Sequence, residues 1–370
     1  MRIRQRFLIA STAIACAAAS VSCTVDTPQV AVAAASSGTG VRGQYIVTLK
    51  HPSQMARTVA FPTLHRFTNG FAAKLSSAQL AKVRRDPNVA AVEQDQIMKI
   101  STTQKNPTWG LDRLDERVLP LSRTYGYTHT GAGVDAYVID TGIQTTLTQF
   151  GGRADTLYGN EDCNGHGTHV AGIIGSKSYG VAKEVLLHGV QVLDCEGTGA
   201  TSDVIAGVDW VRENHGPTSV ANLSLGGNKS TALNNAVTAL SKSGVFVAVA
   251  AGNENASACS ESPASAASVE ATAASSSNDT RASFSNYGSC VDVYAPGVKI
   301  KSTYLDGTAY MDGTSMASPF VAGVAVLYKS AYGQATFGTV QKWITAHATN
   351  GAIKKNKSKT HNRLLNKSSL

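Results

Sequence analysis

The stretch CNGHGTHVAG (163–172) holds two histidines, His166 and His169, three residues apart among glycines. A zinc site usually pairs histidines at i and i+4 with a glutamate between them, and it needs a third ligand. Neither feature occurs here. Proton transfer is therefore the favoured chemistry, although spacing alone does not choose between the two histidines.

Two further side chains could work with such a histidine. Asp140 follows an apolar run, VDAYVID, and precedes a Thr-Gly pair; a lone aspartate there is most often a turn or cap residue. Ser315 lies where the loop DGTS enters an apolar helical run, a place where serine is ordinarily an N-cap. A helix start also presents unpaired backbone N–H groups. Ser315 is thus a candidate nucleophile with anion-stabilising donors beside it.

Strands and helices that alternate from about Thr102 must position these residues. Four apolar runs predict strands: 134–140, 185–194, 220–225 and 245–251. The run 245–251 is almost continuously apolar, which is typical of a strand in a parallel sheet that is buried on both faces. Residues 202–214 and 231–244 read as helices, the second closed by Gly244. We therefore predict a three-layer α/β domain with a mainly parallel central sheet and active groups at the carboxyl ends of its strands.

A smaller α+β unit precedes this domain. Residues 1–23 carry three early arginines and then an apolar run too short to span a membrane, which predicts a secretory signal peptide. A linker of small residues (24–43) leads to the strand QYIVTLK, a helix over 77–85 and a strand around 89–93. The linker's GTGVRG precedes a strand, whereas the dinucleotide motif must follow one, so we dismiss it. No later apolar run approaches membrane-spanning length, so we expect a soluble, exported protein.

The formal net charge of +8 raises the possibility of a nucleic-acid partner. Residues 1–101 hold 12 Lys and Arg against 4 Asp and Glu, whereas residues 102–370 hold 21 of each. The whole surplus of positive charge, 12 minus 4, lies in residues 1–101, the segment that we expect to be removed. The charge pattern therefore disfavours nucleic-acid binding.

Six cysteines are divided in the same way. Cys16 and Cys23 lie in or near the signal region, and the remaining four are Cys163, Cys195, Cys259 and Cys290. An even number in an exported chain indicates disulfides with three possible connectivities, and free buried thiols are the alternative. Sequential pairing would close two loops of similar length, each stabilising by roughly 3–4 kcal/mol.

These motifs together resemble the subtilisin-type serine proteases of the proteinase K group. Asp140, His166 and Ser315 follow the chain order of that family, within AYVIDTGI, HGTHVAG and GTSMASP, and NLSLGG resembles its substrate cleft. The resemblance covers nearly all of 102–370. Residues 44–101 resemble the inhibitory propeptide of the family.

The resemblance assigns roles to the candidate residues. It makes Ser315 the nucleophile, His166 the base and Asp140 the group that orients the imidazole, and it gives His169 a supporting position. Asn253 matches the side chain that forms the oxyanion hole with the backbone N–H of Ser315. The segment Gly197, Thr198 and Gly199 matches a strand that pairs with extended peptides, and the opposite wall matches Ser224, Leu225, Gly226 and Gly227. Because such pairing uses the main chain, we expect broad specificity.

The same resemblance implies a side-chain pocket, a metal ion and a disulfide pairing. Ala250, Ala251 and Gly252 would leave room for a large apolar side chain, but Glu261 departs from the uncharged residue that relatives often carry, which leaves the preference open. A structural calcium ion would be held by Asp292 and the carbonyls of Ala267 and Val269, and no cofactor would serve catalysis. A second site would keep Asp112 and Asp115 but be weakened or empty. The bridges would be 163–195 and 259–290.

The sequence thus predicts a secreted, extracellular serine endopeptidase, made as a zymogen that cuts itself near Ile100–Thr102. Its partners would be polypeptide substrates and its own propeptide, and we expect a monomer that binds neither nucleic acid nor membranes. A secreted pseudoenzyme or binding protein on the same fold is the alternative, but no triad or oxyanion residue has been lost.

Overall fold

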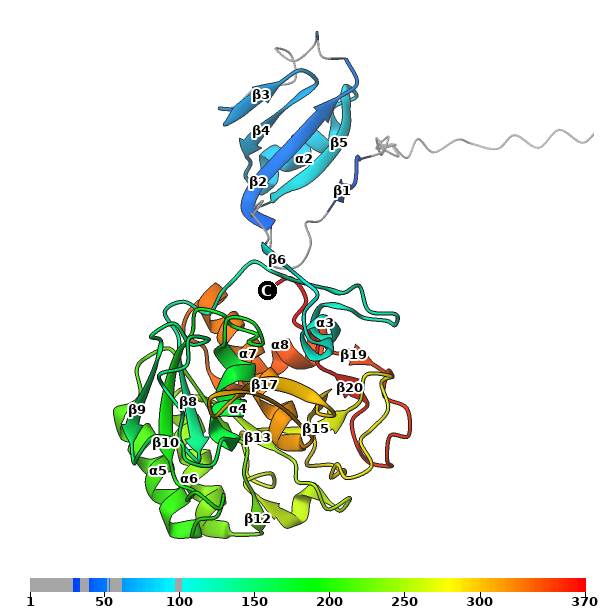
Figure 1. Cartoon of the computed structure of the whole chain (residues 1–370). Helices are drawn as coiled ribbons and strands as arrows, with labels where there is room; N and C mark the ends of the chain where they lie inside the picture. Colours follow the sequence, from blue (N-terminus) through cyan, green and yellow to red (C-terminus); the bar gives the residue numbers. More distant parts are fainter. Residues whose placement is uncertain (1–28, 34–39, 52, 54–61, 97–101) are drawn as a thin grey trace, which may run out of the picture. The chain divides into compact units, whose positions relative to one another are not determined.

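The computed structural model describes residues 29–33, 40–51, 53, 62–96 and 102–370. The chain divides into two compact units, residues 1–99 and residues 100–370 (Figure 1). The predicted signal peptide and the expected cut near Ile100–Thr102 fall wholly or mainly outside the described residues.

The smaller unit is one sheet and one helix. Its strands are β1 (Val32–Ala33), β2 (Gly40–Leu49), β3 (His65–Phe67), β4 (Gly70–Lys74) and β5 (Val89–Gln96), in the spatial order β1-β5-β2-β4-β3. Helix α2 (Ser77–Arg85) begins with a reciprocal cap, because the Ser76 side chain accepts from Gln79 N and the Gln79 side chain accepts from Ser76 N. Val83 of α2 joins Val47, Phe71 and other apolar side chains in the core of this unit.

Two predictions for this region need comment. The helix over 77–85 is present, and the strand around 89–93 extends to Gln96. Strand β1 and the first residues of β2 lie within 24–43, the segment that the sequence analysis treats as a linker. Strand β1 forms because Val32 pairs with Val92 of β5, a contact between positions 60 residues apart that composition does not reveal.

The larger unit is organised around a nine-stranded sheet, ordered β19-β20-β16-β15-β13-β11-β8-β10-β9. Its pairs are parallel except for β19 with β20. The strands are β8 (Asp135–Asp140), β9 (Ala154–Tyr158), β10 (Leu186–Gln191), β11 (Ser219–Leu223), β13 (Phe246–Ala250), β15 (Glu270–Ser275), β16 (Val293–Pro296), β19 (Thr349–Asn350) and β20 (Arg363–Leu364). The predicted mainly parallel sheet is confirmed.

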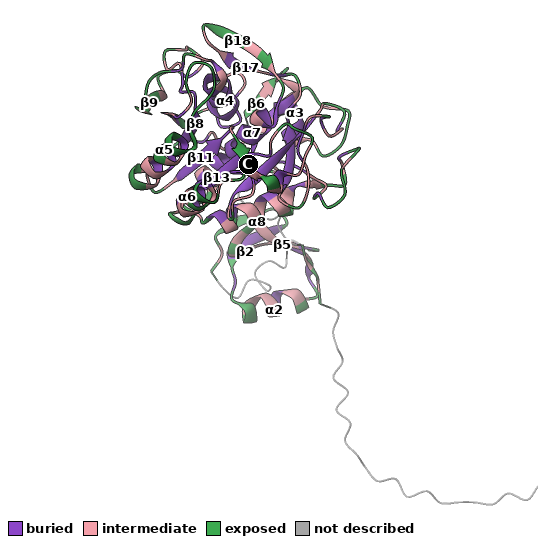
Figure 2. Ribbon diagram, turned by 90° about the horizontal axis from the view of Figure 1, so that it is seen from below, coloured by how far each residue is buried: buried purple, intermediate pink, exposed green. Residues whose placement is uncertain are grey.

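Helices cover both faces of this sheet. Phe246 and Ala248 of β13 join one core with α4 (His166–Gly175), α7 (Thr314–Tyr332) and α8 (Phe337–His347). Val247 and Val249 of the same strand join a second core with α5 (Thr201–Asn214) and α6 (Thr231–Lys242). Successive strand residues point to opposite faces, and helices cover both faces, so every residue of β11 and β13 is buried (Figure 2).

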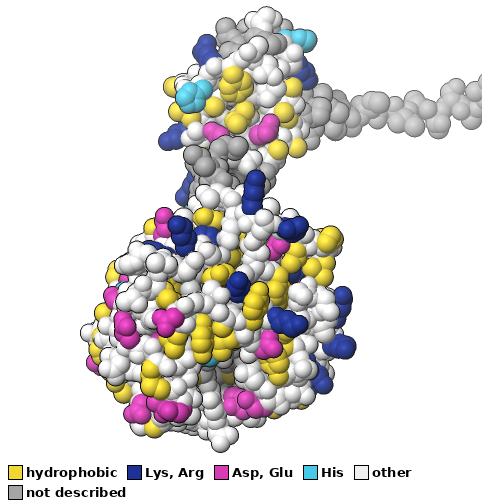
Figure 3. Space-filling view, in the orientation of Figure 1, with side chains coloured by type: hydrophobic (Ala, Val, Ile, Leu, Met, Phe, Trp, Pro, Cys, Tyr) yellow, Lys and Arg dark blue, Asp and Glu magenta, His cyan; other side chains and the backbone are white. Residues whose placement is uncertain are grey.

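Smaller elements complete the unit. Helix α3 (Trp109–Asp115) packs Leu111 and Leu114 into the core with α7, and the 3-10 helix η2 (Ala258–Ser260) places Ala258 in the core with α5 and α6. Three two-stranded sheets pair β6 (Thr102–Lys105) with β7 (Thr124–Tyr127), β12 (Gly227–Asn228) with β14 (Glu261–Ser262), and β17 (Ile300–Tyr304) with β18 (Gly307–Met311). In the described part of the chain, no helix is long and apolar enough to cross a membrane. The face drawn in Figure 3 carries both acidic and basic side chains on the larger unit.

Candidate active site

Asp140 and His166 meet at the carboxyl end of β8. Asp140 is the last residue of β8 and fully buried, and His166 is the first residue of α4. The His166 Nδ1 lies 2.7 Å from Asp140 Oδ1, which also accepts from the backbone N–H of Thr141 at 2.8 Å. Because a carboxylate only accepts, Nδ1 carries the proton and Nε2 is left as the proton acceptor.

The loop before His166 is held by a residue that the sequence analysis missed, Asp162. Its buried carboxylate accepts from the backbone N–H groups of Asn164 and Gly165 at 2.9 and 2.8 Å. It also accepts from Thr141 Oγ1 and from both N–H and hydroxyl of Thr168. An aspartate two residues before the Asn-Gly pair is an Asx-turn signal that could have been recognised.

The carboxylates of Asp140 and Asp162 influence the pKa of His166. Burial lowers the pKa of the imidazole, whereas the charge of Asp140, its hydrogen bond and the charge of Asp162 raise it. The net result is a pKa above the ordinary value of histidine. A positive charge that forms on His166 during a reaction is thereby stabilised.

His169 has a different environment from His166. It is fully buried, and its Nε2 lies 3.1 Å from the carbonyl oxygens of Ile300 and Ala309. Burial lowers the pKa of His169 to about 4, so the ring is neutral and donates from Nε2. His169 therefore ties α4 to the β17–β18 hairpin and takes no carboxylate partner.

Ser315 is the second residue of α7, and its backbone is anchored to the loop after β11. Pro319 lacks an N–H, so the Ser315 carbonyl has no helical donor four residues on; it accepts from the Ser224 hydroxyl at 2.7 Å instead. The Ser315 hydroxyl donates to the Ser224 carbonyl at 3.0 Å. No hydrogen bond joins Ser315 to His166 among the described residues, so the Ser315 O–H must turn away from the Ser224 carbonyl before His166 can take its proton.

Two donors beside Ser315 are free to bind an oxyanion. The Asn253 side-chain carbonyl accepts from the N–H and hydroxyl of Thr314 at 2.9 and 3.0 Å, which leaves its NH₂ group available. Neither that NH₂ group nor the Ser315 N–H has an acceptor among the residues that the structure describes. Thr314, which the sequence analysis did not name, orients this amide.

Two cavities adjoin these groups. One, of about 490 Å³, is lined by His166 and by most of the predicted peptide-binding residues, namely Gly197, Thr198, Gly199, Ser224, Leu225 and Gly226. The other, of about 90 Å³, is lined by Ser315, Asn253, Ala250 and Gly252, with Leu225 and Gly226 shared between the two. Gly227 lies in β12 and lines neither cavity.

Ala251, which the sequence analysis expects at the side-chain pocket, is not among the residues that line the small cavity. Ala251 is fully buried in the core with α5 and α6, because residues along this segment alternate between faces. Two carboxylates, Glu254 and Glu261, line the small cavity instead. The pocket is therefore smaller and more acidic than expected.

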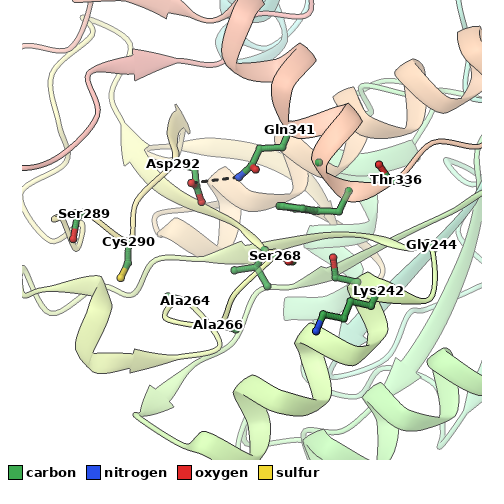
Figure 4. Close-up of a pocket in the computed structure, with 14 residues that line it drawn as sticks. Lys242, Gly244, Ala264, Ala266, Ser268, Ser289, Cys290, Asp292, Thr336 and Gln341 are labelled. Atoms are coloured by element: carbon green, nitrogen blue, oxygen red, sulfur yellow. Dashed lines mark hydrogen bonds between the residues drawn. The ribbon is translucent and has the colours of Figure 1, made fainter.

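Asp292, the predicted calcium ligand, lines a separate cavity of about 550 Å³ together with Ser268, Val269 and Gln341 (Figure 4). Its Oδ2 accepts from Ala271 N at 2.9 Å, and its Oδ1 has only a 3.5 Å contact from Gln341. Burial raises the pKa of Asp292 to about 6, so the carboxylate would gain from a cation. The described residues hold no group of three or more His, Cys, Asp or Glu suited to a metal, so backbone carbonyls would have to contribute.

The disulfide bonds are Cys163–Cys195 and Cys259–Cys290, the sequential pairing. The first joins the loop before α4 to the loop after β10, and Asn164 Nδ2 donates to the Cys195 carbonyl at 2.8 Å. This bridge thus braces the segment that carries His166. Cys290 lies two residues before Asp292.

Comparisons with known proteins agree on one group. Residues 131–364 match the model of the subtilase family, and residues 62–101 match that of the peptidase inhibitor I9 family. The chain is similar to the extracellular serine proteinase of Thermus sp. strain Rt41A, with 49% identity over 77% of this chain and 72% of the relative.

Two further similarities extend this result. The alkaline serine exoprotease A of Vibrio alginolyticus is 43% identical over 85% of this chain, but the match spans only 65% of that longer relative. A crystal structure of a cold-adapted subtilisin-like serine proteinase is similar with a TM-score of 0.71 and 48% identity, covering 72% of this chain and all of the other. The predicted resemblance and fold are thus confirmed.

Proposed function

The chain belongs to the subtilase family, and from that premise we propose that it is a secreted serine endopeptidase, made as a self-processed zymogen, that cleaves polypeptides with broad specificity. The observation that carries the proposal is the 2.7 Å contact between Asp140 and His166 beside a cleft that also holds Ser315 and two free donors.

The chemistry is acyl transfer. His166 Nε2 takes the proton of the Ser315 hydroxyl as the oxygen attacks the peptide carbonyl carbon, while Asp140 stabilises the imidazolium. The oxyanion is bound by the Asn253 NH₂ group and the Ser315 N–H; loss of one such donor typically costs roughly 3–4 kcal/mol of transition-state stabilisation. His166 then gives the proton to the leaving amine, and water hydrolyses the acyl-enzyme by the same steps in reverse.

The substrate binds as an extended chain. Gly197, Thr198 and Gly199 on one wall and Ser224, Leu225 and Gly226 on the other line the larger cavity, and their main-chain groups can pair with a peptide of almost any sequence. Many cleavage sites are therefore accepted, subject to the preference of the smaller cavity.

The smaller unit acts as an inhibitor that is removed. The match of residues 62–101 to a peptidase inhibitor family supports this role, and the name of the Thermus relative, an extracellular proteinase, supports export. The mature enzyme is a monomer without nucleic acid or membrane partners, in keeping with the equal numbers of acidic and basic residues in 102–370.

A structural calcium ion is part of the proposal. The Asp292 carboxylate with one weakly bonded oxygen, together with the Ala267 and Val269 carbonyls, offers hard oxygen ligands of the kind calcium prefers. Glu270 is buried beside Asp292 with neither carboxylate oxygen hydrogen-bonded, and burial and then the charge of Asp292 raise its pKa well above the ordinary value, so a nearby cation would favour its ionised form. The ion would stabilise the fold and take no part in catalysis. At the second candidate site both Asp112 oxygens already accept hydrogen bonds, from Ser122 and Arg123, which favours no ion there.

Hydrolysis of casein by the processed protein, together with labelling of Ser315 by a fluorophosphonate, tests the activity. We expect both, and we expect neither in Ser315→Ala. A folded, processed protein that neither cleaves casein nor reacts with the probe would favour the alternative, a binding protein on this fold.

A further inference from the structure

The small cavity beside Ser315 contains two acidic side chains that the proposed chemistry does not use. Glu254 follows Asn253 in the loop after β13, and Glu261 is the first residue of β14. Both line the same cavity of about 90 Å³ as the nucleophile and the oxyanion amide.

Glu261 is held toward the cavity by strand pairing. Asn228 of β12 lies opposite Glu261, and Gly227 lies opposite Ser262. The Ser262 hydroxyl accepts from Ser230 N at 2.8 Å and donates to the Ser230 carbonyl at 3.2 Å. The Glu261 side chain is half-buried and has no hydrogen bond or ion pair in the part of the chain that the structure describes. Burial, and then the charge of Glu254, raise the pKa of the Glu261 carboxyl, as expected for an uncompensated pair of acids.

Glu254 is fixed in place by Asn286. The Asn286 Nδ2 donates to Glu254 Oε2 at 2.8 Å, and its Oδ1 accepts from Glu254 N at 3.1 Å. Gly252 makes room for this arrangement, because a Cβ there would lie 2.2 Å from Asn286 Nδ2 and 2.7 Å from Glu254 Oε2. The salt bridges among the described residues include neither Glu254 nor Glu261, so no described lysine or arginine forms an ion pair with either carboxylate.

The position of the cavity decides which substrate residue enters it. In the proposed reaction Ser315 attacks the peptide carbonyl group and Asn253 binds its oxygen, and both residues line this cavity. The nearest substrate side chain is therefore the one on the residue that supplies that carbonyl, the P1 residue. Four further lining residues, Leu225, Gly226, Ala250 and Gly252, are apolar or lack a side chain and suit a methylene stem, and the polar Ser262 and Thr314 complete the lining.

We propose that this cavity is the S1 pocket, which receives the P1 side chain, and that Glu261, together with Glu254, selects lysine or arginine at P1. The inference rests on the proposed peptidase function and names its substrate class. A cationic side chain forms charge-assisted hydrogen bonds with these carboxylates, whereas an aromatic ring would remove them from water without a partner. In trypsin, a carboxylate in the S1 pocket selects basic P1 residues through the same attraction between opposite charges.

Paired peptide substrates measure the preference. The processed wild-type enzyme is assayed with peptide p-nitroanilides that share P4 to P2 and differ at P1: lysine, arginine, phenylalanine, and norleucine as an uncharged analogue of lysine. We expect kcat/KM for lysine to exceed that for norleucine by about tenfold at low salt, a ratio that corresponds to about 1.4 kcal/mol. The ratio should decrease as salt screens the exposed Glu254 and the half-buried Glu261.

Glu261→Gln keeps the size of the side chain and removes its charge. The lysine-to-norleucine ratio should fall severalfold, toward one, while kcat/KM for norleucine is maintained or rises. Glu213→Gln is the matched control, since Glu213 is an exposed residue of α5 that lines none of these cavities; it makes the same change in net charge and should leave the ratio unaltered.

The outcomes separate this inference from the proposed function. An enzyme that cleaves the phenylalanine or norleucine substrate with no advantage for lysine or arginine, and with a ratio unchanged in Glu261→Gln, overturns the inference alone. Absence of cleavage of every substrate, without fluorophosphonate labelling, overturns the peptidase function itself.

Discussion

His166 is suited to act as a base because the charges of two buried carboxylates, Asp140 and Asp162, raise its pKa against the opposing effect of burial. Its side chain retains 21% exposure, whereas Asp140 has none, so the imidazole is reachable from the cleft and its partner is not. His169, three residues on, lacks such a carboxylate partner. The chemistry of each histidine therefore depends on its neighbours in space.

The pH dependence of kcat/KM should report His166. Only the neutral imidazole accepts a proton, and its pKa is raised, so activity should fall as pH decreases through a value above 6.5. In Asp140→Asn the acid limb should move to lower pH, and kcat should fall by about 10⁴. Stopped assays of a chromogenic peptide between pH 5 and 10 provide the measurement. Asp155→Asn, which alters the pair between exposed Asp155 and largely buried His188, is the control. An acid limb that stays in place in Asp140→Asn would contradict the assignment.

His169 should contribute a pH-dependent term to stability. Its folded pKa of about 4 lies below its ordinary value of 6.5, so the unfolded state binds the proton more readily between these values. Its contribution is full above pH 6.5 and decreases by about 3 kcal/mol as pH falls to 4. Urea unfolding of inactive Ser315→Ala protein, with and without His169→Gln, isolates this term. The stability difference between the two should shrink as pH decreases; a constant difference would argue against it.

At the scale of elements, the loop from β9 to α4 depends on Asp162. Five hydrogen bonds end on this carboxylate, and they fix the start of α4 relative to the end of β8. Asp162→Asn would turn an NH₂ group toward some of these donors.

We expect Asp162→Asn to lose about 2–4 kcal/mol of unfolding free energy, because buried donors are left without an acceptor. The rate should also fall more than tenfold, since His166 would be less well positioned and less basic. Thermal melting and kcat/KM measure the two effects. Asp209→Asn, on the surface of α5 beside Arg212, should change stability by less than about 1 kcal/mol. Equal stability losses in the two variants would refute the role of the Asp162 network.

At the scale of the whole molecule, a cation at Asp292 should stabilise the larger unit. A ligand at 100 times its dissociation constant adds about 2.7 kcal/mol to the folded state. Excess chelator should therefore lower the melting temperature of the processed enzyme by several degrees, and calcium should restore it. Asp292→Asn should melt lower and be insensitive to chelator. A wild-type melting temperature unaffected by chelator would speak against the site.

Maturation is a second property of the whole chain. The Ser315→Ala precursor should fold but remain joined, because the substitution removes the nucleophile and almost no packing volume. Intact mass of the purified precursor, produced without other proteases, should equal that of the uncut chain. Maturation at the wild-type rate would exclude self-cleavage near Ile100–Thr102.

Local patterns were sufficient for the elements and for most of the chemistry. The continuous apolar run 245–251 predicted a strand buried on both faces, and β13 is one, because burial on two faces leaves no place for a polar residue. The helix over 77–85 followed from its local polar and apolar pattern. Asp140, His166 and Ser315 were found from residue type and position at element ends, with the chain order supplied by resemblance.

The tertiary structure alone decided which groups meet. Asp140 and His166 are 26 residues apart, Ser224 and Ser315 are 91 apart, and their contacts depend on the strand order β11-β8-β10 and on α7 packing against β11. The same holds for Ala251, which points into a core, and for Glu254 and Glu261, which share a cavity. Sequence spacing specifies local backbone periodicity, whereas the direction of a side chain toward a distant partner is fixed only when the sheet and its helices pack together.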